Sequence, residues 1–276
     1  MKLNSDKVVV GQDKLLKELG NVFTIFKTSD CEIRPHSFLT GSSGTGKTLI
    51  IKTICDHLKL GFVELNGASM TKEGTSGNSL SKALTPLLQQ EGKPTVVFVD
   101  EFDKLFISGN SNSDLAHEST NGVQNEFLKV LESPTASVFH DYGKYVNAST
   151  KNCLFVFAGA FNGQEDITID DLRTFGIKTE FLGRVGLCFN TAQLSLDNLY
   201  TILDRSPLLK TYLQIYEDVD RKVVVDRIQE VLKQNFDMNT LGARQISTLI
   251  HQYFIKGGKL EEDAKSITFQ EKLVLN

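Results

Sequence analysis

Residues 41–48 read GSSGTGKT, which is the spacing of a phosphate-binding loop. Glycines at these positions let backbone N–H groups approach phosphate oxygens, and the helix that follows adds the positive end of its dipole. The Lys47 ammonium group would reach the β- and γ-phosphates of a nucleotide, and the Thr48 hydroxyl would bind Mg²⁺. We therefore expect an ATP site with Mg²⁺, whose phosphate-binding residues are Ser43, Gly44, Thr45, Gly46, Lys47, Thr48 and Leu49.

Two adjacent acids, Asp100 and Glu101, follow the apolar run at residues 95–99. A carboxylate at the end of a buried strand can hold Mg²⁺ through water, so Asp100 is the expected metal residue alongside Thr48. Glu101 could polarise the attacking water as a general base. An acid pair after a strand is otherwise often only a helix start, but the phosphate loop upstream favours catalysis. We expect Asp103 to be a solvated or structural carboxylate.

The elements that must position these groups are short apolar runs separated by helical patterns. Such runs indicate a parallel sheet covered on both faces, and thus a three-layer α/β domain. Helices are expected at 47–59 and 121–132, the second ended by Ser133-Pro134. The five expected strands are residues 36–40, 61–66, 95–100, 153–159 and 186–191.

After residue 191 the pattern becomes helical. Helices are expected at 194–203, capped by Ser195, at 221–236, and at 243–256, closed by two glycines. We place a domain boundary near 191–194, which gives a nucleotide-binding domain at 1–192 and a small helical domain at 193–276. Residues 266–275 could form a terminal strand or hairpin.

Two long stretches, 107–122 and 133–152, resist assignment to a helix or strand. The first is rich in Ser, Asn and Gly, and both are long for connectors. The second could be a hairpin that turns near Asp141–Lys144.

Composition narrows the class of protein. The chain has 276 residues, a net charge of −4 and a pI of about 5.8, and no basic run that would indicate nucleic-acid binding. Its four cysteines are far apart and lack metal-site spacing, so we expect reduced thiols, no zinc and a cytoplasmic protein. No signal-peptide core is present, and no apolar run approaches the roughly 18 residues of a membrane span.

Five separated motifs resemble the AAA+ ATPase module of ClpX and HslU, the protein-unfolding rings, and occur in that family's order. The resemblance runs from Val10 to about Ile250. It implies a three-layer P-loop AAA+ domain with a five-stranded parallel sheet, followed by a small, mainly α-helical domain. The motifs are DEFDKL, GVQNEFLKVLE, FVFAGAFNG, DLRTFGIKTEFLGRVGLCFN and LGARQISTLI.

The resemblance also implies site residues. Arg184, in EFLGR, matches the arginine finger that reaches a neighbour's γ-phosphate, with Arg173 as a weaker competitor. Arg244, in LGAR, matches the sensor-2 arginine. No polar sensor-1 residue is evident, and Asn162 is only a candidate. The segment matching the adenine pocket is Val9, Val10, Gly11 and Gln12, with Ile202 on the other face of the base.

Several features depart from the family. Its pore loop has an aromatic between glycines, but here Thr75 and Ser76 stand between Gly74 and Gly77. We expect no zinc module of the ClpX kind. The segment 162–170 is too short for a peptidase-docking loop. We therefore do not expect a ClpP-type peptidase partner. The aromatics that could replace the pore residue are Phe106, Phe139, Tyr142 and Tyr145.

The leading hypothesis is a ring-forming ATPase that remodels or unfolds a protein, without a membrane partner; the resemblance implies a hexamer of identical chains. One alternative is an AAA+ ATPase that acts on nucleic acid or a nucleoprotein complex, because polar loops suit a nucleic-acid backbone. A second is a slow, nucleotide-dependent scaffold, which the intact Asp100-Glu101 pair argues against.

Overall fold

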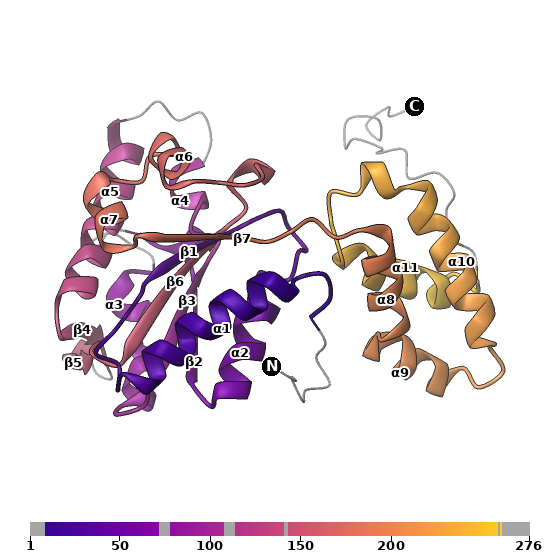
Figure 1. The fold of residues 1–276 in the computed structure, drawn as a ribbon, viewed down its shortest axis with the longest axis horizontal. Helices are drawn as coiled ribbons and strands as arrows, with labels where there is room; N and C mark the ends of the chain where they lie inside the picture. Colours follow the sequence, from indigo (N-terminus) through magenta and orange to yellow (C-terminus); the bar gives the residue numbers. More distant parts are fainter. Residues whose placement is uncertain (1–8, 72–77, 108–113, 141–142, 259, 261–276) are drawn as a thin grey trace. The chain divides into compact units, whose positions relative to one another are not determined.

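The computed structural model describes residues 9–71, 78–107, 114–140, 143–258 and 260 (Figure 1). By internal contacts the chain divides into two compact units, residues 1–192 and 193–276. Among the described residues, no helix is both long and apolar enough to cross a membrane. The predicted terminal strand at 266–275 lies outside the described residues.

The first unit is built on a five-stranded parallel sheet, as the sequence predicted, and its strand order is β2-β3-β6-β1-β7. β3 and β6 are buried along almost their whole length because both faces are covered, which explains why their sequences are continuously apolar. The strands are β1 (Ser37–Thr40), β2 (Gly61–Asn66), β3 (Thr95–Asp100), β6 (Cys153–Gly159) and β7 (Leu187–Asn190).

Each face of the sheet has its own hydrophobic core. Helices α1 (Asp13–Thr28) and α2 (Lys47–Leu58) pack together on one face, over alternate residues of β3 and β6 (Figure 1). The intervening residues of these strands face α3 (Leu80–Ala83), α5 (Asp114–Glu132) and α7 (Thr179–Arg184) on the other face. This is the three-layer arrangement that the apolar runs predicted.

The smaller elements of this unit lie in the connections between strands. A separate antiparallel hairpin pairs β4 (Thr135–Phe139) with β5 (Tyr145–Ser149) and confirms the hairpin predicted within 133–152. The remaining elements are η1 (Gly67–Ser69), η2 (Thr85–Gln90), α4 (Lys104–Ile107), η4 (Phe161–Gly163) and α6 (Ile169–Thr174).

One prediction was wrong in part: the helix expected at 121–132 is longer, and it includes part of the stretch that resisted assignment. Helix α5 begins at Asp114, well before the expected start at residue 121. Residues 114–120 carry no apolar stripe and therefore gave no periodic signal, but helix propagation needs only backbone hydrogen bonds once the buried stripe of Val123, Phe127, Val130 and Leu131 anchors the rest.

The second unit is a helical cluster around its own core of leucine, isoleucine, valine and aromatic side chains. The predicted cap at Ser195 is present as a reciprocal capping box with Asn198. Gly257 and Gly258 have positive φ after the last helix, as expected for a glycine stop. The elements are α8 (Leu196–Asp204), α9 (Pro207–Ile215), α10 (Arg221–Gln234), η5 (Phe236–Met238) and α11 (Arg244–Ile255).

Candidate nucleotide site

The phosphate loop connects β1 to α2, and its backbone requires glycine. Gly41, Gly44 and Gly46 have φ values of 138°, 76° and 92°, which side-chain-bearing residues rarely adopt. At Gly41 space is also lacking, because a Cβ there would lie 1.8 Å from the Thr191 hydroxyl oxygen. The loop therefore exposes backbone amides at the start of α2, which is the arrangement that binds phosphate.

Lys47 is folded back onto its own loop. Its ammonium group donates to the carbonyl oxygens of Gly41 at 2.6 Å and Ser42 at 3.0 Å. A phosphate oxygen is a stronger acceptor for this charge than a neutral carbonyl. The lysine is thus held within the loop by bonds that a nucleotide would replace.

The structure brings together Thr48, in the first turn of α2, and Asp100, the last residue of β3. The Thr48 hydroxyl donates to Asp100 Oδ2 at 3.4 Å, and the other carboxylate oxygen accepts the backbone N–H of Glu101 at 2.9 Å. A hydroxyl and a carboxylate are both hard oxygen donors of the kind that Mg²⁺ prefers. The two side chains therefore fit a magnesium site beside the phosphates.

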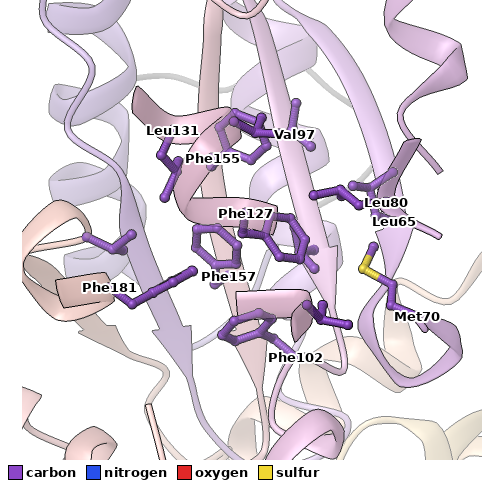
Figure 2. Close-up of a cluster of buried hydrophobic side chains, with 14 of the residues drawn as sticks. Leu65, Met70, Leu80, Val97, Phe102, Phe127, Leu131, Phe155, Phe157 and Phe181 are labelled. Atoms are coloured by element: carbon purple, nitrogen blue, oxygen red, sulfur yellow. The ribbon is translucent and has the colours of Figure 1, made fainter. Parts of the chain in front are cut away.

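Glu101 is exposed and has a φ of 54°, an uncommon conformation for a residue with a side chain. The next residue, Phe102, is fully buried, and its backbone N–H donates to Ala158 O at 2.8 Å. Figure 2 shows the Phe102 ring within the cluster of buried aromatic side chains. Its centroid lies 4.8 Å from that of Phe157 and 5.5 Å from that of Phe181. Packing of Phe102 therefore holds the turn that presents Glu101 to solvent.

Asp103 has a structural position. Its side chain is 1% exposed, and Oδ2 accepts the backbone N–H of Phe161 at 3.1 Å. This bond ties the segment after β3 to the segment after β6. Asn162 follows directly and is exposed with a φ of 59°, and a Cβ on Gly163 would lie 3.8 Å from Ser42 Oγ. The sensor-1 candidate is thus carried by a turn next to the phosphate loop.

Arg184 is the last residue of α7, and its guanidinium forms an ion pair with Glu132 at 2.8 Å. Its side chain is 58% exposed. Within the described residues its ionic partner is therefore a glutamate at the end of α5, and not a residue of the phosphate loop. Arg173, the weaker competitor, pairs with Asp170 at 3.0 Å on the surface.

Gln12 is 2% exposed, and both ends of its amide are used by one backbone residue. Its Nε2 donates to Ala192 O at 2.7 Å, and its Oε1 accepts the Ala192 N–H at 2.9 Å. The amide of Gln12 therefore holds the segment after β7. Val9 and Val10, the other side chains assigned to the adenine pocket, are half-buried, and Gly11 has a φ of 73°.

The remaining predicted site residues lie in the second unit or outside the described part. Arg244 is the first residue of α11 and is exposed, and Ile202 is half-buried on α8 against that unit's core. Thr75, Ser76 and Tyr142 lie outside the described residues. Of the other proposed pore aromatics, Phe106 packs on Phe102 with 5.2 Å between centroids, and Phe139 packs on Tyr145 at 5.7 Å.

Sequence reasoning missed Thr191, whose hydroxyl donates to that of Thr45 at 2.8 Å. One signal was available, since Thr191 directly follows the last strand and the carboxyl ends of parallel strands meet at the edge where the phosphate loop lies. The four cysteines are free, as the expectation of reduced thiols requires, and Cys31, Cys55 and Cys153 are buried. Burial raises the pKa of Cys55 and Cys153 to about 12. No group of three or more His, Cys, Asp or Glu side chains that could hold a metal ion occurs within the part of the chain that is described.

Comparison with known proteins identifies related sequences. The family model described as "ATPase family associated with various cellular activities (AAA)" matches residues 37–181, which span β1 to α7. The ATP-dependent Clp protease ATP-binding subunit ClpX of Bacteroides thetaiotaomicron is 28% identical over 89% of this chain and 72% of its own length. The ClpX of Treponema denticola is 24% identical over 98% of this chain and 78% of its own length.

Proposed function

The chain belongs to the AAA family of ATPases and resembles ClpX over most of its length, and from this premise we propose that it uses ATP hydrolysis to unfold or remodel a protein. The observation that carries the proposal is the 3.4 Å approach of the Thr48 hydroxyl to Asp100, with Glu101 beside them. The proposal is supported by a lysine, two oxygen donors and an exposed carboxylate that lie around one loop.

In the proposed reaction the loop amides and Lys47 bind the β- and γ-phosphates. Thr48 and Asp100 hold Mg²⁺, which when bound neutralises phosphate charge. Glu101 accepts a proton from the attacking water, and its exposure leaves the carboxylate accessible to that water. Val9, Val10 and Gly11 pack on the adenine while Gln12 supports that wall, and Ile202 and Arg244 contact the nucleotide from the small domain.

We further propose that Arg184 acts on the nucleotide of a neighbouring copy in a homo-oligomeric ring, with a hexamer expected. Its half-exposed side chain at the end of α7 supports this role, because the Glu132 pair is a surface interaction that is readily exchanged. Hydrolysis would then change the angle between the 1–192 and 193–276 domains. Action without a ClpP-type peptidase, and a cytoplasmic location, belong to the same proposal.

The test is unfolding of a fluorescent protein that carries an unstructured tail. We expect Glu101→Gln to retain ATP binding but to lower hydrolysis about 10²-fold or more and to abolish unfolding. Glu32→Gln, on the surface of the same unit, is the matched control and should change neither. Arg184→Ala should also abolish hydrolysis, and mixing it with Glu101→Gln should restore part of it if arginines act between copies.

Two results would contradict the proposal. Hydrolysis by Arg184→Ala at the wild-type rate would exclude the shared site. Stimulation of hydrolysis by single-stranded DNA, and not by an unstructured protein, would instead favour a nucleic-acid substrate.

A further inference from the structure

Thr191 lies where the chain leaves the first unit, and it touches the phosphate loop. Its hydroxyl donates to Thr45 Oγ1 at 2.8 Å, and it fills the space beside Gly41 where a Cβ would otherwise lie. Thr45 itself is 6% exposed, so this contact is largely shielded from water. A residue next to the domain boundary is therefore bonded directly into the nucleotide-binding loop.

The contact continues from Thr45 to Lys47. The Thr45 hydroxyl donates to Ser42 O at 2.9 Å, and the Lys47 ammonium group donates to the same carbonyl at 3.0 Å. Ser42 O thus accepts from a hydroxyl and from a charged donor. If Lys47 turns to a bound phosphate, Ser42 O accepts from Thr45 alone, and that hydrogen bond becomes stronger. Because hydrogen bonds in a chain polarise one another, the bond from Thr191 to Thr45 should then strengthen as well.

The backbone around Thr191 is held by two further elements. The Thr191 N–H donates to Thr40 O of β1 at 2.9 Å, and the Ala192 N–H donates to the buried Gln12 side chain at 2.9 Å. These two amides report how firmly the start of the connection to the second unit is held. The Thr191 side chain is the group that links this anchored backbone to the loop.

We propose that Thr191 is a positioning residue that passes the state of the phosphate loop to the start of the inter-unit connection, through the series Lys47, Ser42 O, Thr45 Oγ1 and Thr191 Oγ1. The inference rests on the proposed function in that the loop binds ATP and the two units move relative to each other. It adds a contact through which the first event reaches the start of the connection, at residues 191–192. Nucleotide binding is expected to tighten the Thr191 contact and so protect the Thr191 and Ala192 amides.

The variant that isolates the hydroxyl is Thr191→Val. A methyl group replaces the donor at nearly the same volume, and Thr45 keeps its bond to Ser42 O, so no buried donor is left without an acceptor. Thr191→Ser retains the hydroxyl and is the conservative rescue. Thr191→Ala removes the hydroxyl with no steric demand, and serves if the valine variant does not fold.

The experiment is hydrogen–deuterium exchange of the peptide covering 187–196, with and without a non-hydrolysable ATP analogue. In the wild type and in Thr191→Ser, the analogue should slow exchange at the Thr191 and Ala192 amides roughly threefold or more, which is the size of one hydrogen bond. In Thr191→Val the analogue should still bind, but exchange at these amides should not change.

The proposal is overturned if the wild-type amides do not respond to the analogue, or if Thr191→Val responds as the wild type does. Both results are independent of the unfolding assay. A chain that unfolds no protein can still show the exchange response, and an active unfoldase can lack it. Failure of the inference and failure of the proposed function are therefore separate outcomes.

Discussion

The polar groups at the two ends of β1 differ in the kind of hydrogen-bond partner that they have. At the start, His36 lies just before the strand, and its Nδ1 accepts the backbone N–H of Phe155 at 3.0 Å while its ring packs edge-on against the Phe155 ring. At the far end, Thr40 leads into a loop with positive φ angles and a lysine bonded to its own carbonyls. The hydrogen bond of His36 is made within the fold, whereas the bonds of Lys47 are ones that a ligand can replace.

The difference indicates that residues at the start of β1 mainly support stability, whereas residues at its carboxyl end mainly support activity. Burial makes His36, at the start of β1, costly to change, because its ring nitrogen is the fixed acceptor of the Phe155 N–H. At the carboxyl end, several groups hold weak or exchangeable partners, so their loss should reduce activity more than stability. Substitutions at the two ends test this directly.

The largest expected effect is at the nucleotide end. Lys47→Ala should lower ATP hydrolysis by roughly 10³-fold, since a positioned charge on a transferring phosphoryl group is lost. The melting temperature should change little, because the Lys47 ammonium group donates to carbonyl oxygens of its own loop and these can bond to water once it is gone. The check is steady-state hydrolysis beside a thermal melt, with Lys52→Ala, which breaks the exposed pair with Glu64, as control. If the melting temperature fell enough to account for the lost activity, the claim that this end of β1 affects activity more than stability would be wrong.

The next largest effect is on stability at the other end. Burial lowers the pKa of His36 from 6.5 to about 4, with a further contribution from nearby Arg34. Because the folded pKa is the lower one, the unfolded chain binds the extra proton. The free energy of unfolding is therefore highest above pH 6.5. It falls by about 3 kcal/mol in all as the pH drops from 6.5 toward 4.

Denaturant unfolding between pH 7 and 4 measures this loss. His36→Asn keeps an acceptor for the Phe155 N–H but does not titrate, so its stability should fall less over the same interval. Equal losses in both proteins would show that His36 is not the group responsible.

The smallest effect concerns Arg34, which donates to Thr150 O at 2.9 Å. Arg34→Ala should lower the free energy of unfolding by about 1 kcal/mol. It should also raise the pKa of His36, since a neighbouring positive charge is removed. Hydrolysis should remain at the wild-type rate, and NMR titration of the His36 ring gives the pKa. A drop in hydrolysis would show that Arg34, near the start of β1, also affects the nucleotide site, and would contradict the difference proposed between the two ends.

The strands, the Ser195 cap and the hairpin were predictable because each leaves a local pattern in the sequence. Helix α1 has such a pattern too, with Leu16, Leu19 and Phe23 on one buried stripe, but it was not identified. Residues 114–120 had no pattern to read. The site divides in the same way. The loop and the acid pair are local motifs, whereas the pairing of Arg184 with Glu132 and of Thr191 with Thr45 joins residues far apart in the chain and follows only from the fold.

The aromatic cluster of Figure 2 has a consequence for mixtures of intact and damaged chains. Phe102 follows Glu101, and Phe181 belongs to the short helix that ends at Arg184, so the same rings support the acid and the arginine. In the proposed assembly these two groups serve different nucleotides. A substitution that disrupts the cluster would therefore inactivate the subunit's own site through Glu101 and its neighbour's site through Arg184. A few such subunits would stop hydrolysis at more sites than their own.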